Sequence, residues 1–552
     1  MDLGSLATPI SLLRRVKLGP LGPLPDLPFN LSALNEAGVI KPMRPDKLVR
    51  VARELRRWGA SPAAGISVAA ISNPGRTMLV DEQGSISFAK MQWRSNALAR
   101  ALANEGVGPG DGVAIMCRNH RLFIDATLAV AKLGASALYM NTAFSGPQLT
   151  DVVDREQPAV LIYDEEFAGL LEDATGSVKS FVAWREDGSS GDTTIDELIE
   201  AADDADLDPP EEPARFVILT SGTTGTPKGA QRGSPDSLAP LAAMFSRIPL
   251  RAEEKTVIAA PLFHSWGFAH FMLGLSLETT YVLQRKFDPE ATLDAISEQE
   301  ATALVVVPVM MQRILQLDEE TLSSYDLPSL RVTAASGSAL PGELATKWMD
   351  HFGDNLYNLY GSTEVAWATI ATPEDLREAP GTAGKAPRGT IVKIVDSEGK
   401  GEVPAGETGR VFVGNDMAFE GYTGGGGKDD YEGLLSSGDV GHFDQHGRLF
   451  IDGRDDEMIV SGGENVFPRE VEDLLSSHDA VKEVAVIGVD DDDFGQRLKA
   501  FVVLTETDSV EADELKAYVK KNLARYKVPR EIDFLDSLPR NATGKILKRE
   551  LA

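Results

Sequence analysis

Short apolar runs alternate with helical stretches between about residue 80 and residue 350. In the helical stretches, at 95–104 and 122–132, apolar residues recur three or four positions apart. The apolar runs are four or five residues long and rich in Val, Ile, Leu and Ala, as expected of strands buried on both faces. They cover residues 113–117, 159–163, 257–260, 303–307 and 330–334. This alternation predicts an α/β fold with mostly parallel sheets.

The pattern changes after about residue 385, where short strands such as 409–414 are separated by glycine-rich turns. A charged, hinge-like segment at 453–457 then precedes a compact unit of mixed elements. In that unit we expect helices at 468–478 and 514–526 and strands at 484–489 and 499–504. The chain is therefore predicted to have three parts: a basic N-terminal segment (1–60), a large multi-subdomain domain (61–455) and a small mobile α+β C-terminal domain (456–552).

The N-terminal segment has the opposite charge balance from the rest of the chain. Residues 1–57 hold ten basic and five acidic residues, whereas the whole chain carries a formal net charge of −30. Prolines at 20, 23, 25 and 28 predict an extended linker. The stretch 47–58 that follows has helical spacing, with arginines beside an apolar face. Two interpretations remain open: a helix on an anionic membrane surface, or a helix docked on the main body with its arginines in water.

Composition narrows the class of protein. With 84 acidic and 54 basic residues, the chain is poorly suited to nucleic acid, and no such partner is expected. Cys117 is the only cysteine, so no intrachain disulfide can form and a reducing, cytoplasmic location is predicted. The uncharged stretch 256–277 is long enough for a membrane span, but Pro261 and His264 interrupt it. We expect a buried strand, a loop and a helix there.

The stretch Thr220–Gly229 combines five hydroxyl side chains, three glycines, one proline and one lysine after an apolar run. Glycines let the backbone approach an anion closely, and hydroxyls and a lysine add donors and charge. This composition predicts a phosphate-holding loop, although a solvated Ser/Thr/Gly linker is the alternative. It is not a P-loop, because Pro227 and Gly229 occupy positions where that motif has Gly and Ser or Thr.

Five motifs in fixed order give the chain its most specific resemblance. They are Ser221–Gly229 (SGTTGTPKG), Tyr360–Glu364 (YGSTE), Ser437–Asp439 (SGD), Gly453–Arg454 and Pro539–Lys545 (PRNATGK). With them, the chain from about residue 80 onward resembles the adenylate-forming enzymes, a superfamily that includes acyl-CoA synthetases. The resemblance implies a two-step reaction. A carboxylate attacks the α-phosphorus of ATP to give acyl-AMP and pyrophosphate, and the thiol of coenzyme A then displaces AMP.

The resemblance also implies roles for single residues. Thr223, Thr224 and Lys228 would lie closest to the phosphates, and Glu364 would bind Mg²⁺. Tyr360 would stack on adenine, Asp439 would accept the ribose hydroxyls and Arg454 would contact ribose or phosphate. The other residues expected at the nucleotide are Thr220, Ser221, Gly222, Gly225, Gly337, Ser338, Ala339, Asn358, Gly361 and Thr363. The alternatives are a surface glutamate at 364 and an aspartate in an Asx-turn at 439.

Lys545 resembles the mobile lysine that stabilises charge during adenylation, although by position it could be a solvated lysine of the tail. Asp456 falls at the family's hinge, about which the small domain would rotate. The rotation would withdraw Lys545 and bring the segment Ser461, Gly462 and Gly463 to the pantetheine arm of coenzyme A. These roles are implied by the resemblance alone.

The acyl pocket is harder to derive. His264 matches the position beside the substrate carboxylate and Phe268 could line an apolar tunnel, but both could be core residues. The segment 335–340 lacks the usual two glycines and proline, no histidine follows Gly229, and 420–433 lacks a Trp-containing pattern. These departures concern the acid substrate more than the ATP chemistry.

The expected function is that of an ATP- and Mg²⁺-dependent acyl-CoA synthetase acting on a medium- or long-chain fatty acid. Within enzymes, the alternatives are a fatty acyl-AMP ligase, a ligase for an aryl or small acid, and an enzyme that loads a carrier protein. The alternative from another class is a catalytically silent nucleotide- or lipid-binding protein. A peripheral membrane contact through the basic N-terminus and a homodimer are further hypotheses.

Overall fold

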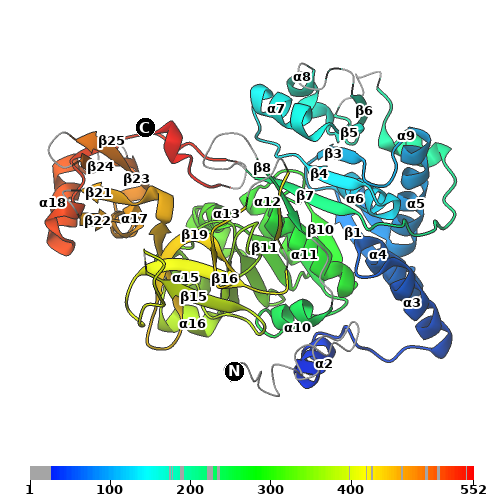
Figure 1. The fold of residues 1–552 in the computed structure, drawn as a ribbon, viewed down its shortest axis with the longest axis horizontal. Helices are drawn as coiled ribbons and strands as arrows, with labels where there is room; N and C mark the ends of the chain where they lie inside the picture. Colours follow the sequence, from blue (N-terminus) through cyan, green and yellow to red (C-terminus); the bar gives the residue numbers. More distant parts are fainter. Residues whose placement is uncertain are drawn as a thin grey trace, which may run out of the picture.

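A computed structural model shows a large body and, at one end, a smaller lobe that holds the C-terminal strands (Figure 1). It describes residues 26–551 except 173–175, 177, 187–191, 221–227, 233–236, 397, 418, 424–426, 462–463, 492–494, 507–509 and 542–543. The predicted α/β class with a large domain of mostly parallel sheets and a small C-terminal domain is confirmed.

The first sheet of the body has eight strands in the order β14-β13-β12-β11-β9-β10-β1-β2. Their bounds are β1 Thr77–Asp81, β2 Gly84–Ser87, β9 Lys255–Ile258, β10 Thr280–Leu283, β11 Ala303–Val306, β12 Val332–Ala335, β13 Leu356–Tyr360 and β14 Thr369–Ala371. The six inner strands are parallel, and only β14 and β2 at the edges pair antiparallel. Every residue of β10, β11 and β12 is buried, which explains why these strands are apolar without alternation.

The second sheet has seven strands in the order β17-β8-β7-β4-β3-β5-β6. Their bounds are β3 Gly112–Met116, β4 Ser136–Tyr139, β5 Val160–Tyr163, β6 Lys179–Val182, β7 Arg215–Thr220, β8 Lys228–Arg232 and β17 Phe419–Tyr422. Strands β7, β4, β3, β5 and β6 are parallel to one another. Strand β8 pairs antiparallel with β7, and β17 pairs antiparallel with β8. One hydrophobic core contains residues of both sheets and the helices between them.

The body has fifteen α-helices within the described residues. They are α2 Leu27–Glu36, α3 Pro45–Trp58, α4 Pro62–Ser72, α5 Phe88–Asn104, α6 Arg121–Leu133, α7 Gly146–Glu156, α8 Ala168–Leu171, α9 Ile195–Ala201, α10 Ala239–Phe245, α11 Ser265–Ser276, α12 Pro289–Gln299, α13 Pro308–Leu315, α14 Glu319–Ser323, α15 Gly342–Phe352 and α16 Pro373–Glu378. Strand β9 followed by α11 confirms the strand, loop and helix expected at 256–277. No helix in the described ranges is both long and apolar enough to cross a membrane.

The N-terminal helices correct one expectation. Pro28 lies in the first turn of α2, where a proline is tolerated, so the extended linker predicted for 20–28 does not extend through it. Helix α4 was not predicted, because it is buried on most sides and carries no one-sided apolar stripe. Helix α3 lies next to α4 and has one buried residue, Val51, while most of its other residues are exposed, so both interpretations of this helix stay open.

A third sheet and the small lobe complete the fold. The third sheet is antiparallel and consists of β15 Ile391–Val395, β16 Gly409–Gly414, β18 Asp430–Tyr431, β19 Leu434–Phe443 and β20 Leu449–Arg454. The small lobe consists of β21 Ile459–Ser461, β22 Glu464–Val466, β23 Val481–Asp491, β24 Gly495–Leu504, β25 Glu531–Phe534, α17 Pro468–Ser476 and α18 Ala512–Asn522. The lobe has its own hydrophobic core, as expected of a separate folding unit. The domain bounds near residues 60 and 455 stay predictions.

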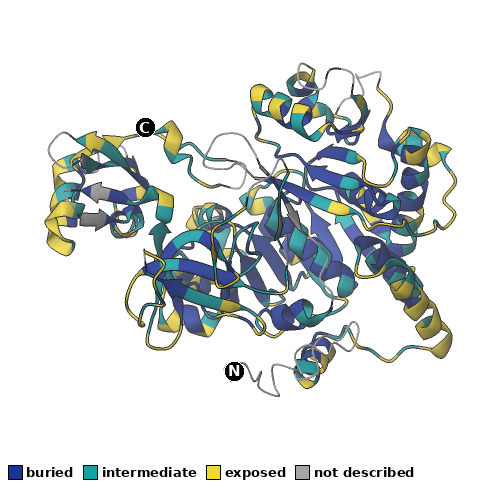
Figure 2. Cartoon of the chain, viewed as in Figure 1, coloured by how far each residue is buried: buried dark blue, intermediate teal, exposed yellow. Residues whose placement is uncertain are grey.

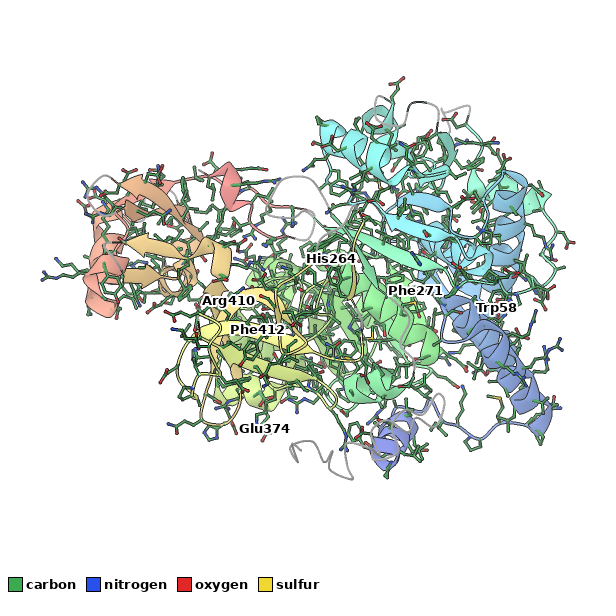
Figure 3. All side chains as sticks on the ribbon, in the orientation of Figure 1. Trp58, His264, Phe271, Glu374, Arg410 and Phe412 are labelled. Atoms are coloured by element: carbon green, nitrogen blue, oxygen red, sulfur yellow. The ribbon has the colours of Figure 1, made fainter. Side chains whose placement is uncertain are left out.

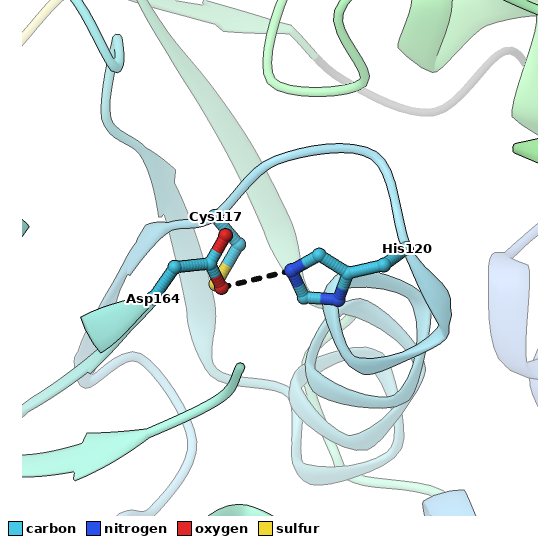
Figure 4. A group of neighbouring side chains, drawn as sticks. All are labelled: Cys117, His120 and Asp164. Atoms are coloured by element: carbon cyan, nitrogen blue, oxygen red, sulfur yellow. Dashed lines mark hydrogen bonds and ion pairs between the residues drawn. The ribbon is translucent and has the colours of Figure 1, made fainter. Parts of the chain in front are cut away.

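A buried group of Cys117, His120 and Asp164 lies where β3 and β5 end and α6 begins (Figure 4). His120 Nε2 donates to Asp164 Oδ1 at 2.8 Å, and the Leu122 N–H donates to His120 Nδ1 at 3.2 Å. The second Asp164 oxygen accepts the Arg118 N–H at 2.9 Å. Burial opposes ionisation of Asp164, but His120 and the Arg118 N–H outweigh it and lower its pKa. The group therefore fastens the two strand ends to the start of the helix.

Candidate active site

One cavity of about 1370 Å³ lies between the body and the small lobe. Its walls come from segments that follow β12 and β13, from β19 and β20, and from the C-terminal segment. The carboxyl ends of parallel strands are where open α/β sheets bind ligands. The cavity brings together thirteen residues expected from the sequence: His264, Phe268, Gly337, Ser338, Ala339, Asn358, Tyr360, Gly361, Thr363, Glu364, Asp439, Arg454 and Lys545.

The expected phosphate loop connects the antiparallel strands β7 and β8. Ser221, Gly222, Thr223, Thr224 and Gly225 lie outside the described residues. Thr220 and Lys228 face each other in the register of the two strands, and their side chains are not described. A Cβ on Gly229 would lie 2.4 Å from Thr423 Oγ1, so only glycine allows β8 to approach the end of β17 this closely.

Glu364 is held by two hydroxyl groups. Tyr422 Oη donates to Glu364 Oε1 at 2.6 Å, and Ser362 Oγ donates to Glu364 Oε2 at 2.8 Å. Burial opposes ionisation, but the bond from Tyr422 and the charge of Lys428 outweigh it, so the pKa of Glu364 lies below its ordinary value. Glu364 is thus an anion in a defined orientation at the cavity, and its role as a metal ligand stays a prediction. A carboxylate of this kind is a suitable oxygen ligand for Mg²⁺.

Asp439 lies at the centre of a polar network. Its Oδ2 accepts a hydrogen bond from Tyr360 Oη at 2.5 Å, and its Oδ1 lies 3.3 Å from Arg454 Nη1. Arg454 Nε also donates to Asp456 Oδ1 at 3.1 Å, so the guanidinium joins Asp439 to the expected hinge residue. Because Asp439 lies in β19 and Tyr360 and Arg454 bind its carboxylate, the Asx-turn alternative is wrong.

Three buried polar atoms of cavity-lining residues lack hydrogen-bond partners among the described residues. They are Ser72 Oγ, Asn358 Oδ1 and His264 Nδ1. Burial lowers the pKa of His264 to about 4, so the ring is neutral at physiological pH. Buried polar atoms without partners are rare, and those that face a cavity are positioned for a ligand. Asn358 Oδ1 fits an amino group such as that of adenine, and the residues present therefore fit ATP.

Lys545 reaches the cavity from a tight turn of the C-terminal segment. The Asn541 N–H donates to the Lys545 carbonyl, and Asn541 Oδ1 accepts the Lys545 N–H, both at 2.9 Å. Gly544, at φ +80°, lies against α13, and a Cβ there would lie 2.2 Å from Val309 Cγ1. Gly544 therefore lets the turn contact the body and place Lys545 at the cavity.

The structure does not bring all expected residues to the cavity. Ser461 is buried in β21 and does not line it, and Gly462 and Gly463 lie outside the described residues. Sequence reasoning missed Ser362, Tyr422 and Lys428, all of which line the cavity. Their only signal was position, since Ser362 lies inside the Tyr360–Glu364 motif and the others flank the glycine-rich loop.

Two family models match the chain, one after the other along the sequence. AMP-binding enzyme matches residues 67–423, and AMP-binding enzyme C-terminal domain matches residues 470–545. The chain belongs to the AMP-binding enzyme family. The expected resemblance to adenylate-forming enzymes is therefore confirmed, and this AMP-binding enzyme is an AMP-forming acid–thiol ligase.

This AMP-binding enzyme is similar over most of its length to named relatives and to solved structures. Indoleacetate–CoA ligase of Aromatoleum aromaticum is 32% identical over 495 residues, covering 87% of this chain and 95% of the relative. Feruloyl-CoA synthase of an Amycolatopsis species is 32% identical, covering 85% of this chain and 93% of the relative. The structure of o-succinylbenzoate coenzyme A synthetase of Bacillus subtilis with ATP and magnesium has a TM-score of 0.77, 28% identity and coverage of 88% of this chain and 98% of that one.

Buried His270, in the helix α11 beside the site, should make the stability of the fold depend on pH. His270 of α11 is 3% exposed, and burial lowers its pKa to about 3. Because its ordinary pKa is 6.5, this lowering costs no stability above pH 6.5 but destabilises the fold as the pH falls towards 3. We expect His270→Phe to reduce the loss of unfolding free energy between pH 6.5 and 5 by about 2 kcal/mol. Urea unfolding at both pH values measures it, and the exposed-site variant His446→Phe should keep the wild-type pH slope. Equal slopes for His270→Phe and wild type would contradict the expectation.

Proposed function

We propose that the protein converts an apolar carboxylic acid, with ATP, Mg²⁺ and coenzyme A, into its CoA thioester through acyl-AMP. The observation that carries the acid class is the apolar arm of the cavity. The side chains that line it include Phe216, Leu241, Phe268 and Met272, and residues of α4, which contacts α11, line it as well. An apolar lining that includes both α11 and α4 suits an acyl chain, so a medium- or long-chain fatty acid is the first candidate substrate.

The physical difficulty of the first step is that an anionic carboxylate attacks a polyanion. Positive charge and positioning must therefore supply the catalysis. Lys545 and Arg454 line the cavity as cations, and Glu364 would hold Mg²⁺, which neutralises phosphate charge. Asp439 would accept the ribose hydroxyls, and neutral His264 would contact the acid. In this arrangement, Tyr360 holds Asp439 in place through its hydroxyl group while its ring faces the adenine.

A ring-bearing acid is the second candidate substrate. The indoleacetate and feruloyl ligases act, by their names, on aromatic acids. The near part of the apolar arm is itself aromatic, since the rings of Phe216 and Phe268 have centroids 5.3 Å apart. An aryl acid would stack there, whereas a fatty acid would continue towards α4.

A substrate panel tests the proposal. Pyrophosphate release and thioester formation would be measured with hexadecanoate, octanoate, indoleacetate, ferulate and benzoate, each with and without coenzyme A. The fatty-acid proposal predicts a larger kcat/KM for hexadecanoate or octanoate than for any aryl acid. The reverse order would support the ring-bearing acid, and acyl-AMP without thioester would support a ligase that stops at the adenylate. No product with any acid would contradict the proposed function.

Tyr422 provides a graded test of the Mg²⁺ assignment. Tyr422→Phe removes the hydroxyl that orients Glu364 and keeps the ring, so we expect the apparent KM for Mg²⁺ to rise about 10-fold. Turnover at saturating Mg²⁺ should change little, which separates an effect on metal binding from general damage. The measurement is a Mg²⁺ titration of pyrophosphate release. Tyr431→Phe in β18, outside the cavity, serves as the matched control and should leave the KM unchanged. An unchanged KM in Tyr422→Phe would argue against Glu364 as the metal ligand.

Rotation of the small lobe about Asp456, thioester formation near Ser461, the peripheral membrane contact and the homodimer stay predictions.

A further inference from the structure

The part of the cavity that is lined by elements near the N-terminus forms its second end, distinct from the part lined by Lys545 and Glu364. From Phe268 and Met272 of α11 its walls pass to Ala64 and Val68 of α4. At the end, the walls come from the segment before α3, from α3 itself and from the turn that joins α3 to α4. These last lining residues are Val39, Lys41, Met43, Val51, Leu55, Gly59, Ala60, Ser61 and Pro62.

The helix at this end presents apolar side chains to solvent. Helix α3 projects from the body and is mostly exposed along its length (Figure 2). Leu48, Val49 and Leu55 are 56%, 70% and 50% exposed. Leu55 also lines the cavity, so the rim of its second end reaches the exposed surface. Single exposed apolar residues are common, but three on one projecting helix form a patch.

The rest of the exposed surface of α3 carries positive charge. With 3.6 residues per turn, Arg53 and Arg56 lie about 40° and 20° around the helix from Val49, and Arg50 lies about 100° from it. Arg50, Arg53 and Arg56 are exposed and form no ion pair with any residue that the structure describes. The two acidic residues of α3 are already paired, Asp46 with Arg44 and Glu54 with Arg57. In a chain with a formal net charge of −30, this is a local basic surface rather than a general property. Apolar side chains beside arginines complement a bilayer that contains anionic lipid.

We infer that the second end of the cavity is a mouth through which the acid enters from an anionic lipid bilayer, with α3 lying on the bilayer surface. Leu48, Val49 and Leu55 would insert among the lipids. Arg53 and Arg56, which lie nearest to Val49 around the helix, would contact the phosphates most directly, with the charge of Arg50 nearby. A long-chain acid partitions into bilayers, so entry at this mouth would spare it a transfer through water. The lipid contact stands on α3 alone, whereas the entry route rests on the proposed function.

A second copy of the chain is the competing occupant of this surface. Two copies that met through α3 would bring their unpaired arginines together, and like charges disfavour such contact. An anionic bilayer meets the same surface with opposite charge, and the observations therefore favour lipid.

Vesicle co-sedimentation tests the contact without reference to activity. The full-length protein is expected to bind vesicles of phosphatidylcholine with phosphatidylglycerol, not phosphatidylcholine alone, and binding should weaken as salt rises. In Arg50→Glu/Arg53→Glu/Arg56→Glu the partition coefficient should fall about 100-fold, since each basic residue near the surface contributes roughly a factor of five. The matched control Lys520→Glu/Lys521→Glu/Arg525→Glu changes net charge equally on the small lobe and should bind as wild type.

Equal loss in the two triple variants would overturn the proposal, as would vesicle binding without dependence on phosphatidylglycerol. Sedimentation velocity without lipid gives a further outcome. A dimer that the α3 variant loses and the control keeps would assign this surface to a second copy and overturn the lipid contact.

The mouth is tested by substrate length and presentation. The α3 triple variant should turn over octanoate in solution as wild type does, but show at least about 10-fold lower kcat/KM for hexadecanoate presented in phosphatidylglycerol vesicles. Val51→Trp, which narrows the second end, should lower the ratio of hexadecanoate to octanoate kcat/KM about 10-fold, and thermal unfolding would confirm its fold. An unchanged ratio in folded Val51→Trp would overturn the mouth. Vesicle binding with no thioester from any acid would instead contradict the proposed function.

Discussion

Replacement of Lys545 by alanine is expected to reduce acyl-AMP formation by about 10²–10³-fold and to leave the second half-reaction nearly intact. The reason is that a cation aimed at charge that develops on the phosphates is worth most in the transition state of the first step. Lys545 lines the same cavity as Glu364, Asp439 and Arg454, although it lies more than 90 residues from Arg454 along the chain. Pyrophosphate release measures the first step, and conversion of supplied acyl-AMP with coenzyme A measures the second.

The control for this change is Lys520→Ala, which removes an exposed lysine from α18 of the same lobe and should affect neither step. Gly544→Ala offers an independent check. Its Cβ would clash with Val309, so the turn could not seat against α13, and the loss should again fall on the first step. If Lys545→Ala slowed both half-reactions equally, the assigned role of this lysine would be refuted.

Glu364→Gln is expected to lower the rate of adenylation by about 10²–10⁴-fold at Mg²⁺ concentrations that saturate the wild-type enzyme. The amide keeps the size of the side chain and removes the negative charge, so the loss reports on Mg²⁺, whose charge stabilisation is worth several kcal/mol. The hydroxyls of Tyr422 and Ser362 would remain in place, but they donate hydrogen bonds that an amide accepts less well. Single-turnover pyrophosphate release over a Mg²⁺ series is the measurement.

Glu374→Gln is the matched control, since Glu374 is an exposed residue of α16 that does not line the cavity. Figure 3 shows it at the lower edge of the body, away from His264. It should leave the Mg²⁺ dependence as in wild type. Retention of wild-type adenylation by Glu364→Gln would show that another residue holds the metal. Comparing Glu364→Gln with Tyr422→Phe distinguishes a direct metal ligand from a residue that orients the ligand.

Because the pKa of Glu364 is lowered and His264 is neutral, the charges of the site are defined before any ligand binds. Glu364 is ionised because the hydroxyl of Tyr422 and the charge of Lys428 overcome burial, and His264 is uncharged because nothing compensates its burial. A neutral imidazole can contact a carboxylate without forming an ion pair that the second step would have to break. The cavity thus combines cations near the phosphates with an uncharged wall near the acid.

The sequence by itself determined the elements whose signals are local. Strands β5, β11 and β12 are buried at every position, and the apolar runs at 159–163, 303–307 and 330–334 predicted them. Through the family resemblance, the ordered motifs predicted residues that the structure brings to one cavity, and their roles at the nucleotide stay predictions. Helix α4 escaped prediction because burial on most sides removes the one-sided periodicity on which such predictions depend.

Only the tertiary structure decided which residues share a cavity. Tyr422 contacts Glu364 because β17 pairs with β8 at the edge of the second sheet, a pairing between segments almost 200 residues apart. Lys545 reaches the same cavity because Gly544 lies against Val309 of α13, and no local signal records that contact. Likewise, only the structure shows that exposed Leu55 of the basic helix α3 lines the cavity, and the proposed entry of the acid depends on that contact. Local patterns record what each segment buries, whereas the site depends on which segments bury it together.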